Sequence, residues 1–137
     1  GLINIKNERQ KKLYLGNLYA KRDWGHAEDY VKAMWLMLQQ KIPQDFVIAT
    51  GQQYTIKDFV HLSSKKLKMK IIWKGTNLKE KAYYNAKVII EIHAKYFRPS
   101  EVDSLKGNAN KAKRKLKWKP TYNINLLIED MIKKIDQ

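Results

Sequence analysis

The sequence predicts a small α/β domain of about four helices and several short strands. Helical and strand-like periodicities alternate along the chain, and neither a low-complexity linker nor an internal repeat interrupts them. The 137 residues suffice for one compact domain with its own core, but not for two full domains. Hydrophobic residues make up 44% and charged residues 30%, as in ordinary folded proteins. We therefore expect residues 1–137 to form a single domain.

The first elements are a strand, a helix and a second strand. Leu13–Leu15 is a short strand candidate that ends at Gly16-Asn17, a pair suited to a turn with positive φ. Ala27–Gln40 has the spacing of an amphipathic helix. Its predicted buried stripe consists of Val31, Met34, Trp35 and Leu38. Phe46–Ala49 is a short apolar run, typical of a buried strand.

A second helix and two further strands are expected in the middle of the chain. Thr55 and Asp58 have the spacing of a capping box, which predicts a helix that begins at Ile56 and ends before Lys68. Ile71–Trp73 and Val88–Ile92 are strand candidates. The segment 76–87 shows no clear period, and we expect it to be a loop.

Short helices and one long helix are expected towards the C-terminus. Glu101–Leu105 and Asn110–Leu116 favour two short helices, and Trp118-Lys119-Pro120 ends the second. The final helix follows Asn123, a candidate N-cap. Its apolar residues share one face at helical spacing: Ile124, Leu127, Ile128, Met131, Ile132 and Ile135.

The formal net charge of +15 allows two interpretations. One is a stand-alone basic module that binds nucleotide or nucleic acid. The other is a solvated surface rich in lysine, since only four of the 28 basic residues are arginine. The dense run from Lys111 to Lys119 fits a solvated helix surface, because cations complement a helix end. Nucleic-acid modules also interleave exposed aromatics with their cations, whereas Trp24, Trp35 and Trp73 lie in segments predicted to be buried. We favour the solvated surface.

No catalytic, cofactor-binding or metal-binding residue is recognised in the chain. Cysteine is absent, and His26, His61 and His93 lack a metal-binding spacing. The chain contains neither a glycine-rich phosphate loop nor a Tyr-x-x-x-Lys pair in a suitable context. No apolar run is long enough to span a membrane, and Gly1–Lys12 is too polar for a signal peptide, so a cytoplasmic location is expected.

Two arginines stand out in a chain that otherwise uses lysine. Arg22 precedes the first predicted helix, and Arg98 follows the strand candidate Val88–Ile92. A guanidinium can hold two phosphate oxygens at once, whereas an ammonium is a mobile point charge. The alternative for each is a surface salt bridge, for instance between Arg22 and Asp23 or Glu28.

The motifs around these arginines resemble one enzyme family. The stretch from Leu15 to Gln39, which contains Arg-Asp-Trp-Gly-His-Ala, resembles the GDP-mannose 4,6-dehydratases of the extended short-chain dehydrogenase/reductase superfamily. So do the segments 45–51, 96–103 and 111–120, the second of which contains Arg-Pro-Ser-Glu-Val-Asp. The resemblance covers nearly the whole chain in the family's order.

The resemblance implies a fold and a division of labour. The chain is expected to be the C-terminal substrate-binding part of such an enzyme, a fragment without the N-terminal Rossmann domain. That domain binds NADP and carries the catalytic Thr or Ser, Glu, Tyr and Lys. The family converts GDP-mannose to GDP-4-keto-6-deoxy-mannose, a precursor of GDP-fucose. The implied partners are GDP-mannose, the missing Rossmann domain and further copies in a homo-oligomer, and this chain alone is expected to be inactive.

The resemblance also implies six substrate-binding residues. Arg22 and Arg98 resemble the arginines that contact the diphosphate from two sides. Glu101 resembles the carboxylate that accepts hydrogen bonds from the ribose. The remaining three lie on the strand and loop that line the nucleotide: Gly16, Asn17 and Lys21. The sequence departs from the family pattern at Tyr19, at Ser100 and His93, and most strongly within 77–87.

Overall fold

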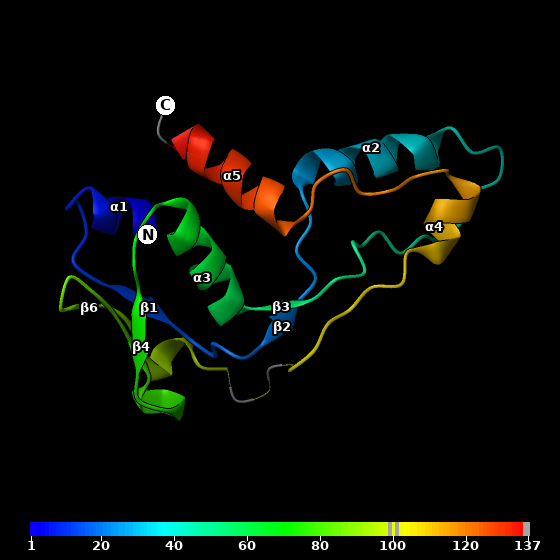
Figure 1. The fold of residues 1–137 in the computed structure, drawn as a ribbon. Helices are drawn as coiled ribbons and strands as arrows, with labels where there is room; N and C mark the ends of the chain where they lie inside the picture. Colours follow the sequence, from blue (N-terminus) through cyan, green and yellow to red (C-terminus); the bar gives the residue numbers. More distant parts are fainter. Residues whose placement is uncertain (99, 101, 136–137) are drawn as a thin grey trace. The chain divides into compact units, whose positions relative to one another are not determined.

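The structure, a computed structural model, describes residues 1–98, 100 and 102–135. These residues form five α-helices, a four-stranded sheet and a two-stranded sheet, which confirms the predicted α/β class (Figure 1). Contacts divide the chain into two compact units. Unit 1 comprises residues 1–20 and 55–103, and unit 2 comprises residues 21–54 and 104–137. We describe each unit by itself.

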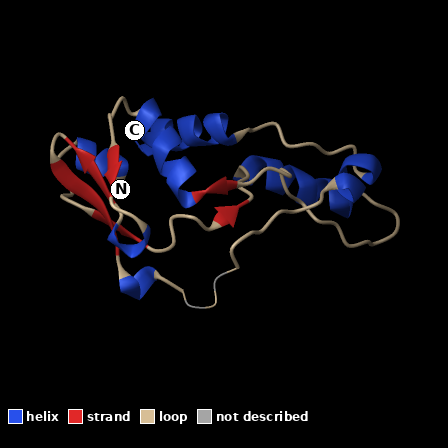
Figure 2. Ribbon diagram, turned by 60° about the horizontal axis from the view of Figure 1, so that its bottom comes forward, coloured by secondary structure: helices blue, strands red, loops and turns tan. Residues whose placement is uncertain are grey.

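The four-stranded sheet belongs to unit 1 and has the strand order β1-β6-β5-β4. Figure 2 shows the strands in red. β1 (Leu13–Leu15) pairs in parallel with β6 (Lys87–Ile92), so that Leu13 lies opposite Ile90. β5 (Lys81–Tyr84) joins β6 and β4 (Ile72–Lys74) by antiparallel pairing. The strand at Leu13–Leu15 is confirmed to the residue, and two of the three other predicted strands, Ile71–Trp73 and Val88–Ile92, to within one residue at each end.

A tight hairpin connects β5 and β6. Both residues of its turn, Asn85 and Ala86, have positive φ, at 49° and 62°. Two successive left-handed residues suit a two-residue hairpin loop, because such a loop follows the twist of the paired strands. The expectation of a loop over 76–87 is therefore wrong, since the segment holds a 3-10 turn, η1 (Asn77–Lys79), and the strand β5. The sequence lacks the Asn-Gly pair that normally predicts such a turn.

Two helices complete unit 1. α1 (Leu2–Lys6) contributes buried Leu2, Ile3 and Ile5. α3 (Ile56–Lys66) begins at the predicted capping box, in which Thr55 Oγ1 accepts from the Asp58 N–H and the Asp58 carboxylate accepts from the Thr55 N–H. A second 3-10 turn, η2 (Ala94–Tyr96), follows β6.

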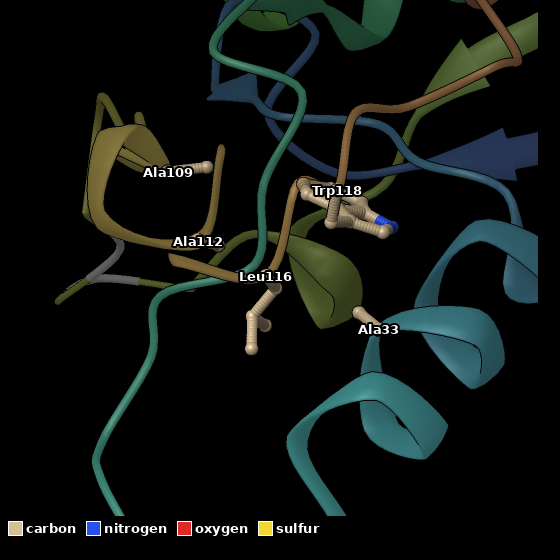
Figure 3. Close-up of a cluster of buried hydrophobic side chains, with 5 residues drawn as sticks. All are labelled: Ala33, Ala109, Ala112, Leu116 and Trp118. Carbon is tan, nitrogen blue, oxygen red and sulfur yellow. The ribbon is translucent and has the colours of Figure 1, made fainter. Parts of the chain in front are cut away.

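Unit 2 is built around a small apolar cluster at α2 (Ala27–Leu38) and α4 (Asn110–Lys115). Figure 3 shows the five buried side chains that form it: Ala33, Ala109, Ala112, Leu116 and Trp118. Trp118 is only 2% exposed, and its indole N–H donates to the Asp29 carbonyl at 2.8 Å. The lysines of α4 are exposed, as expected for a solvated helix face.

The remaining elements of unit 2 are α5 (Ile124–Ile135) and a small two-stranded sheet. Asn123 caps α5 as predicted, since its Oδ1 accepts from the N–H groups of Asn125 and Leu126. Ile124, Leu127 and Ile128 are buried, whereas Met131 and Ile135 are exposed. β2 (Lys21–Arg22) pairs with β3 (Tyr54–Thr55).

The predicted buried face of α2 is wrong. Val31, Met34, Trp35 and Leu38 are 63%, 57%, 59% and 81% exposed, while Ala33 and Asp29 are the buried residues of this helix. α2 is apolar on more than one side, and spacing alone does not reveal which side the rest of the unit covers. The prediction that Trp35 is buried fails for the same reason.

Three further expectations are not met. Phe46–Ala49 forms no strand in the described structure. An extended segment becomes a strand only when its backbone hydrogen-bonds to a neighbouring strand. Gly16 and Asn17 do not have positive φ. The residues 102–105 are not helical, and Ser104 instead forms a parallel bridge with Lys21. Glu101, the first residue of that expected helix, lies outside the described residues.

Candidate functional site

The loop after β1 lies directly against the segment that leads to Arg98. A Cβ at Gly16 would lie 2.1 Å from the carbonyl oxygen of Tyr96, so only glycine fits at this position. The next residue, Asn17, accepts a hydrogen bond from the Tyr19 N–H on its Oδ1 at 2.9 Å, which fixes its amide. Arg98 is exposed two residues after Tyr96. Unit 1 therefore places Gly16 and Asn17 beside the approach to Arg98.

Lys21 and Arg22 lie on β2, in unit 2. The Lys21 carbonyl accepts from the Arg22 guanidinium at 2.8 Å and from the Leu105 N–H at 3.2 Å. Arg22 is half-buried and Lys21 is exposed. The Arg22 guanidinium is thus bound to the carbonyl of the preceding residue, which limits where it can reach.

Asp23, the residue after Arg22, binds the turn at Thr50 and Gly51. Its carboxylate accepts from the Thr50 N–H at 2.9 Å, from the Thr50 hydroxyl at 2.5 Å and from the Gly51 N–H at 2.8 Å. Gly51 has φ +79°, a conformation that favours glycine. From the sequence, Asp23 was considered only as a possible salt-bridge partner of Arg22. Its position directly after Arg22 in the family motif could have indicated a structural role.

The six predicted site residues are distributed over both units. Gly16, Asn17 and Arg98 belong to unit 1, whereas Lys21 and Arg22 belong to unit 2. Glu101 lies outside the described residues. A shared grip of the two arginines on one diphosphate therefore stays a prediction.

One Tyr–Lys pair meets in space, and sequence reasoning missed it. The Tyr19 hydroxyl donates to the buried Glu80 carboxylate at 2.6 Å, and the Lys57 ammonium bonds to the same carboxylate. The Lys57 ammonium also lies 5.5 Å from the Tyr19 ring centroid and 5.1 Å from that of Trp73. These residues are far apart in sequence, so no spacing reveals the cluster.

The electrostatics of this cluster oppose proton-transfer chemistry. The hydrogen bond to Glu80 raises the pKa of the Tyr19 hydroxyl above its ordinary value, and burial raises it further. Lys57 lowers the Tyr19 pKa, but it does not outweigh Glu80. Burial alone would raise the pKa of Glu80, but the hydrogen bonds from Lys57 and Tyr19 lower it. The cluster is a fixed polar network and not an activated tyrosine.

The described residues offer neither a metal centre nor a membrane span. Nowhere in the described ranges do three or more His, Asp or Glu side chains gather in a metal-binding group. In the same ranges, no helix combines the length and apolar character needed to cross a bilayer.

Comparison with known proteins identifies relatives of this sequence. The model of the GDP-mannose 4,6 dehydratase family matches residues 1–131. A GDP-mannose 4,6 dehydratase of Dictyostelium discoideum is 51% identical over 128 residues, which are 92% of this chain and 36% of that protein. The human enzyme of the same name is 49% identical over 86% of this chain and 32% of its own length. The chain spans about a third of the length of these relatives.

Solved structures of low sequence identity share the fold. RMD from Pseudomonas aeruginosa, solved with NADPH, superposes with a TM-score of 0.72 at 16% identity, over 95% of this chain and 38% of its own. The dTDP-glucose 4,6-dehydratase of Bacillus anthracis, solved with NAD, gives a TM-score of 0.73 at 19% identity, over 98% of this chain and 38% of its own. The chain therefore has the fold of about 38% of each of these two proteins.

Proposed function

Because this chain belongs to the GDP-mannose 4,6-dehydratase family, we propose that it is the C-terminal, GDP-mannose-binding portion of such an enzyme. The complete enzyme would convert GDP-mannose to GDP-4-keto-6-deoxy-mannose. The family match over residues 1–131 carries the proposal, together with a length of about a third of the relatives. In this division of labour the chain binds and orients the nucleotide sugar, and another domain carries out the reaction.

The residues proposed to hold the substrate are those of the two arginine motifs. Arg22 and Arg98 would bind the diphosphate, because a guanidinium can donate two parallel hydrogen bonds to phosphate oxygens. Glu101 would accept from the ribose hydroxyls. The nucleotide would lie along Gly16, Asn17 and Lys21. The close approach of Gly16 to the Tyr96 carbonyl supports this arrangement, because it joins the loop of Gly16 to the 3-10 turn η2 before Arg98.

The chain's own residues do not fit a nicotinamide cofactor. Its six glycines are too widely separated to form a dinucleotide-binding loop. Its described Tyr–Lys cluster has a raised tyrosine pKa, which is the wrong direction for a tyrosine that must give up a proton. We therefore place NADP and the catalytic residues on the N-terminal Rossmann domain and derive no hydride or proton transfer on this chain.

The exposed face of α2 is the proposed contact with that domain. The helix is apolar on more than one side, which is typical of a helix buried between two layers. Val31, Trp35 and Leu38 repeat at i, i+4 and i+7, and all three are more than half exposed. A shallow hollow of about 530 Å³ lies beside Val31 and Trp35, and Ala27, Glu28 and Lys32 also line it. The complete enzyme is further proposed to assemble as a homo-oligomer.

Fusion to a family Rossmann domain tests the proposal. The purified chain with GDP-mannose and NADP should show no turnover, whereas the fusion protein should produce the 4-keto-6-deoxy sugar. A fusion in which the catalytic tyrosine of the Rossmann domain is replaced by phenylalanine is the control for background activity. Turnover by the chain alone would contradict the division of labour. A folded fusion that binds NADP but not GDP-mannose would contradict the assignment of substrate binding.

A further inference from the structure

A polar cavity of about 570 Å³ lies in unit 2, away from the α2 face. Two segments line it, the turn 50–52 and the stretch 106–110, and Lys113 completes it from α4. Its size is within the range of about 300 to 1,000 Å³ that small-molecule sites occupy. We call it the Thr50 cavity. Neither arginine of the proposed diphosphate site lines it.

The walls of the Thr50 cavity are held in place. The Asp23 carboxylate fixes the Thr50 and Gly51 N–H groups. On the other side, a Cβ at Gly107 would lie 2.2 Å from the Cβ of Ala49, so the backbone of Gly107 packs directly on the Ala49 side chain. A cavity with such fixed walls does not require the chain to become ordered when a ligand binds.

The lining favours an anion. Lys106 and Lys113 supply two positive charges, and the described residues that line the cavity include no carboxylate, since Asp23, which binds the Thr50 and Gly51 N–H groups, is not one of them. The Gln52 Oε1 accepts from the Tyr54 hydroxyl at 3.0 Å, and the Asn108 Oδ1 accepts from the Asn110 N–H at 3.1 Å. These contacts use the amide oxygens, and an amide NH₂ group can donate to oxyanions. Ammonium and amide donors together are suited to phosphate oxygens.

A second cavity adjoins the first and is lined by aromatic rings. It has a volume of about 190 Å³ and is lined by Trp24, Tyr54 and Tyr122. Thr50 and Gln52 line both cavities, so the two lie side by side. Aromatic side chains bind flat rings by stacking, with little dependence on the identity of the ring. A molecule with a phosphate at one end and a flat ring at the other matches the pair.

We propose that the Thr50 cavity is a second, separate binding site of this chain, which takes a phosphate monoester that carries a flat ring. Lys106 and Lys113 bind the phosphate, and Trp24, Tyr54 and Tyr122 surround the ring. The site requires neither Arg22 nor the Rossmann domain. It therefore operates in the chain as it stands.

Titrations of the ¹⁵N-labelled chain with orthophosphate and with phenyl phosphate test the site. Both ligands should shift the amide signals of Gly107 and Asn108, and only phenyl phosphate should shift the indole N–H signal of Trp24. Phenyl phosphate should bind about tenfold more tightly, because the ring adds a stacking contact. A Lys106→Gln/Lys113→Gln variant should bind both ligands at least about tenfold more weakly. Arg9→Ala, at an exposed arginine outside both cavities and both arginine motifs, should leave both affinities within twofold.

The matched control is Lys41→Gln/Lys119→Gln, which lowers the net charge equally at two exposed lysines outside both cavities. This variant should bind as tightly as the parent. Equal losses in the two double variants, or shifts spread over all exposed lysines, would overturn the proposal and indicate general attraction to a basic chain. Binding of orthophosphate without any preference for phenyl phosphate would overturn the ring part. Because the Gly107 and Asn108 signals report on the Thr50 cavity, which neither Arg22 nor Arg98 lines, failure of this site can be distinguished from failure of the diphosphate site.

Discussion

The imidazole of His26 stacks on the phenol ring of Tyr122, with ring centroids 3.8 Å apart and planes 10° from parallel. His26 is 5% exposed and caps α2, since its Nδ1 accepts from the Glu28 N–H. An Nδ1 that accepts leaves the proton on Nε2, which faces Asp130 of α5 at 3.0 Å. The first turn of α2 and the segment before α5 thus share one polar network.

The central residue of this network is Asp29, and we expect Asp29→Ala to lower the free energy of unfolding by about 3 kcal/mol. Its carboxylate is buried and accepts from the Thr121 N–H, the Thr121 hydroxyl and the Tyr122 N–H, at 2.6–3.0 Å. Alanine would leave these partly buried hydrogen bonds without their acceptor. Urea denaturation followed by circular dichroism measures the change. The exposed Asp45→Ala is the control, and an equal effect of the two substitutions would contradict the assignment.

Acid should destabilise the chain through Asp29 and Glu80. Burial alone would raise the pKa of each carboxyl, but hydrogen bonds outweigh it, from Thr121 and Tyr122 to Asp29 and from Lys57 and Tyr19 to Glu80. Both pKa values are therefore lower in the folded than in the unfolded chain. Their contribution to stability is complete above the unfolded pKa of about 4 and disappears as the pH falls through the folded pKa.

Urea midpoints at pH 7, 4 and 3 measure this effect. The parent should lose more stability below pH 4 than an Asp29→Asn/Glu80→Gln variant, which lacks both titrating groups. The variant will be less stable at pH 7, so the comparison concerns the slope with pH and not the absolute value. Parallel curves for the two proteins would show that other groups cause acid unfolding.

The hairpin turn between β5 and β6 offers a stabilising substitution. Ala86 has φ +62°, a left-handed conformation that costs a residue with a Cβ about 1 kcal/mol relative to glycine. Ala86→Gly should therefore raise the free energy of unfolding by up to about 1 kcal/mol, reduced by the greater freedom of glycine in the unfolded chain. The control is Ala94→Gly, at a position without positive φ, which should not stabilise. Destabilisation by Ala86→Gly would contradict the turn geometry.

Features that depend on residues close in the sequence were predicted correctly, whereas features that depend on distant residues were not. The capping box of Thr55 and Asp58 and the Asn123 cap were predictable, because their partners lie within three residues. The buried face of α2 was not, because it depends on Trp118 and Ala112, about 80 residues further along the chain. The missing strand at Phe46–Ala49 has the same cause, since a strand depends on a neighbour that its own sequence does not specify.

The candidate site shows the same limit. The family motifs identified the segments around Arg22 and Arg98, and the structure adds the contact of Gly16 with Tyr96. The Tyr19–Glu80–Lys57 cluster was not predictable, because Tyr19 and Glu80 are 61 positions apart. Its hydrogen bonds are specific to the folded chain, and no local pattern indicates which carboxylate a tyrosine will meet.

The exposed apolar face of α2 should cause the isolated chain to self-associate. A contiguous apolar patch of several hundred Å² is unusual on a monomer. Trp35→Glu/Leu38→Glu should reduce binding of a hydrophobic dye and shift sedimentation towards the monomer, with little change in stability because both side chains are exposed. Leu78→Glu, at an exposed apolar residue of unit 1, is the control. A monodisperse parent chain that binds no dye would contradict this prediction.

The diphosphate assignment makes the most specific prediction, that Arg22 and Arg98 each contribute to the binding of GDP. A charged hydrogen bond is worth about 1.5 to 3 kcal/mol, so Arg22→Ala or Arg98→Ala should weaken GDP binding by about tenfold to a hundredfold. Arg22→Lys should restore only part of the loss, because lysine keeps the charge but lacks the planar fork.

Calorimetry on the fusion with a Rossmann domain, at two salt concentrations, measures the affinity for GDP. The two salt concentrations separate bidentate hydrogen bonding from general electrostatic attraction, because salt weakens general attraction more than it weakens bidentate hydrogen bonds. Arg9→Ala and Arg114→Ala are the controls, because both arginines lie outside the two arginine motifs. If the motif variants bind GDP within twofold of the parent while a control variant does not, general basic binding explains the affinity better than a diphosphate grip.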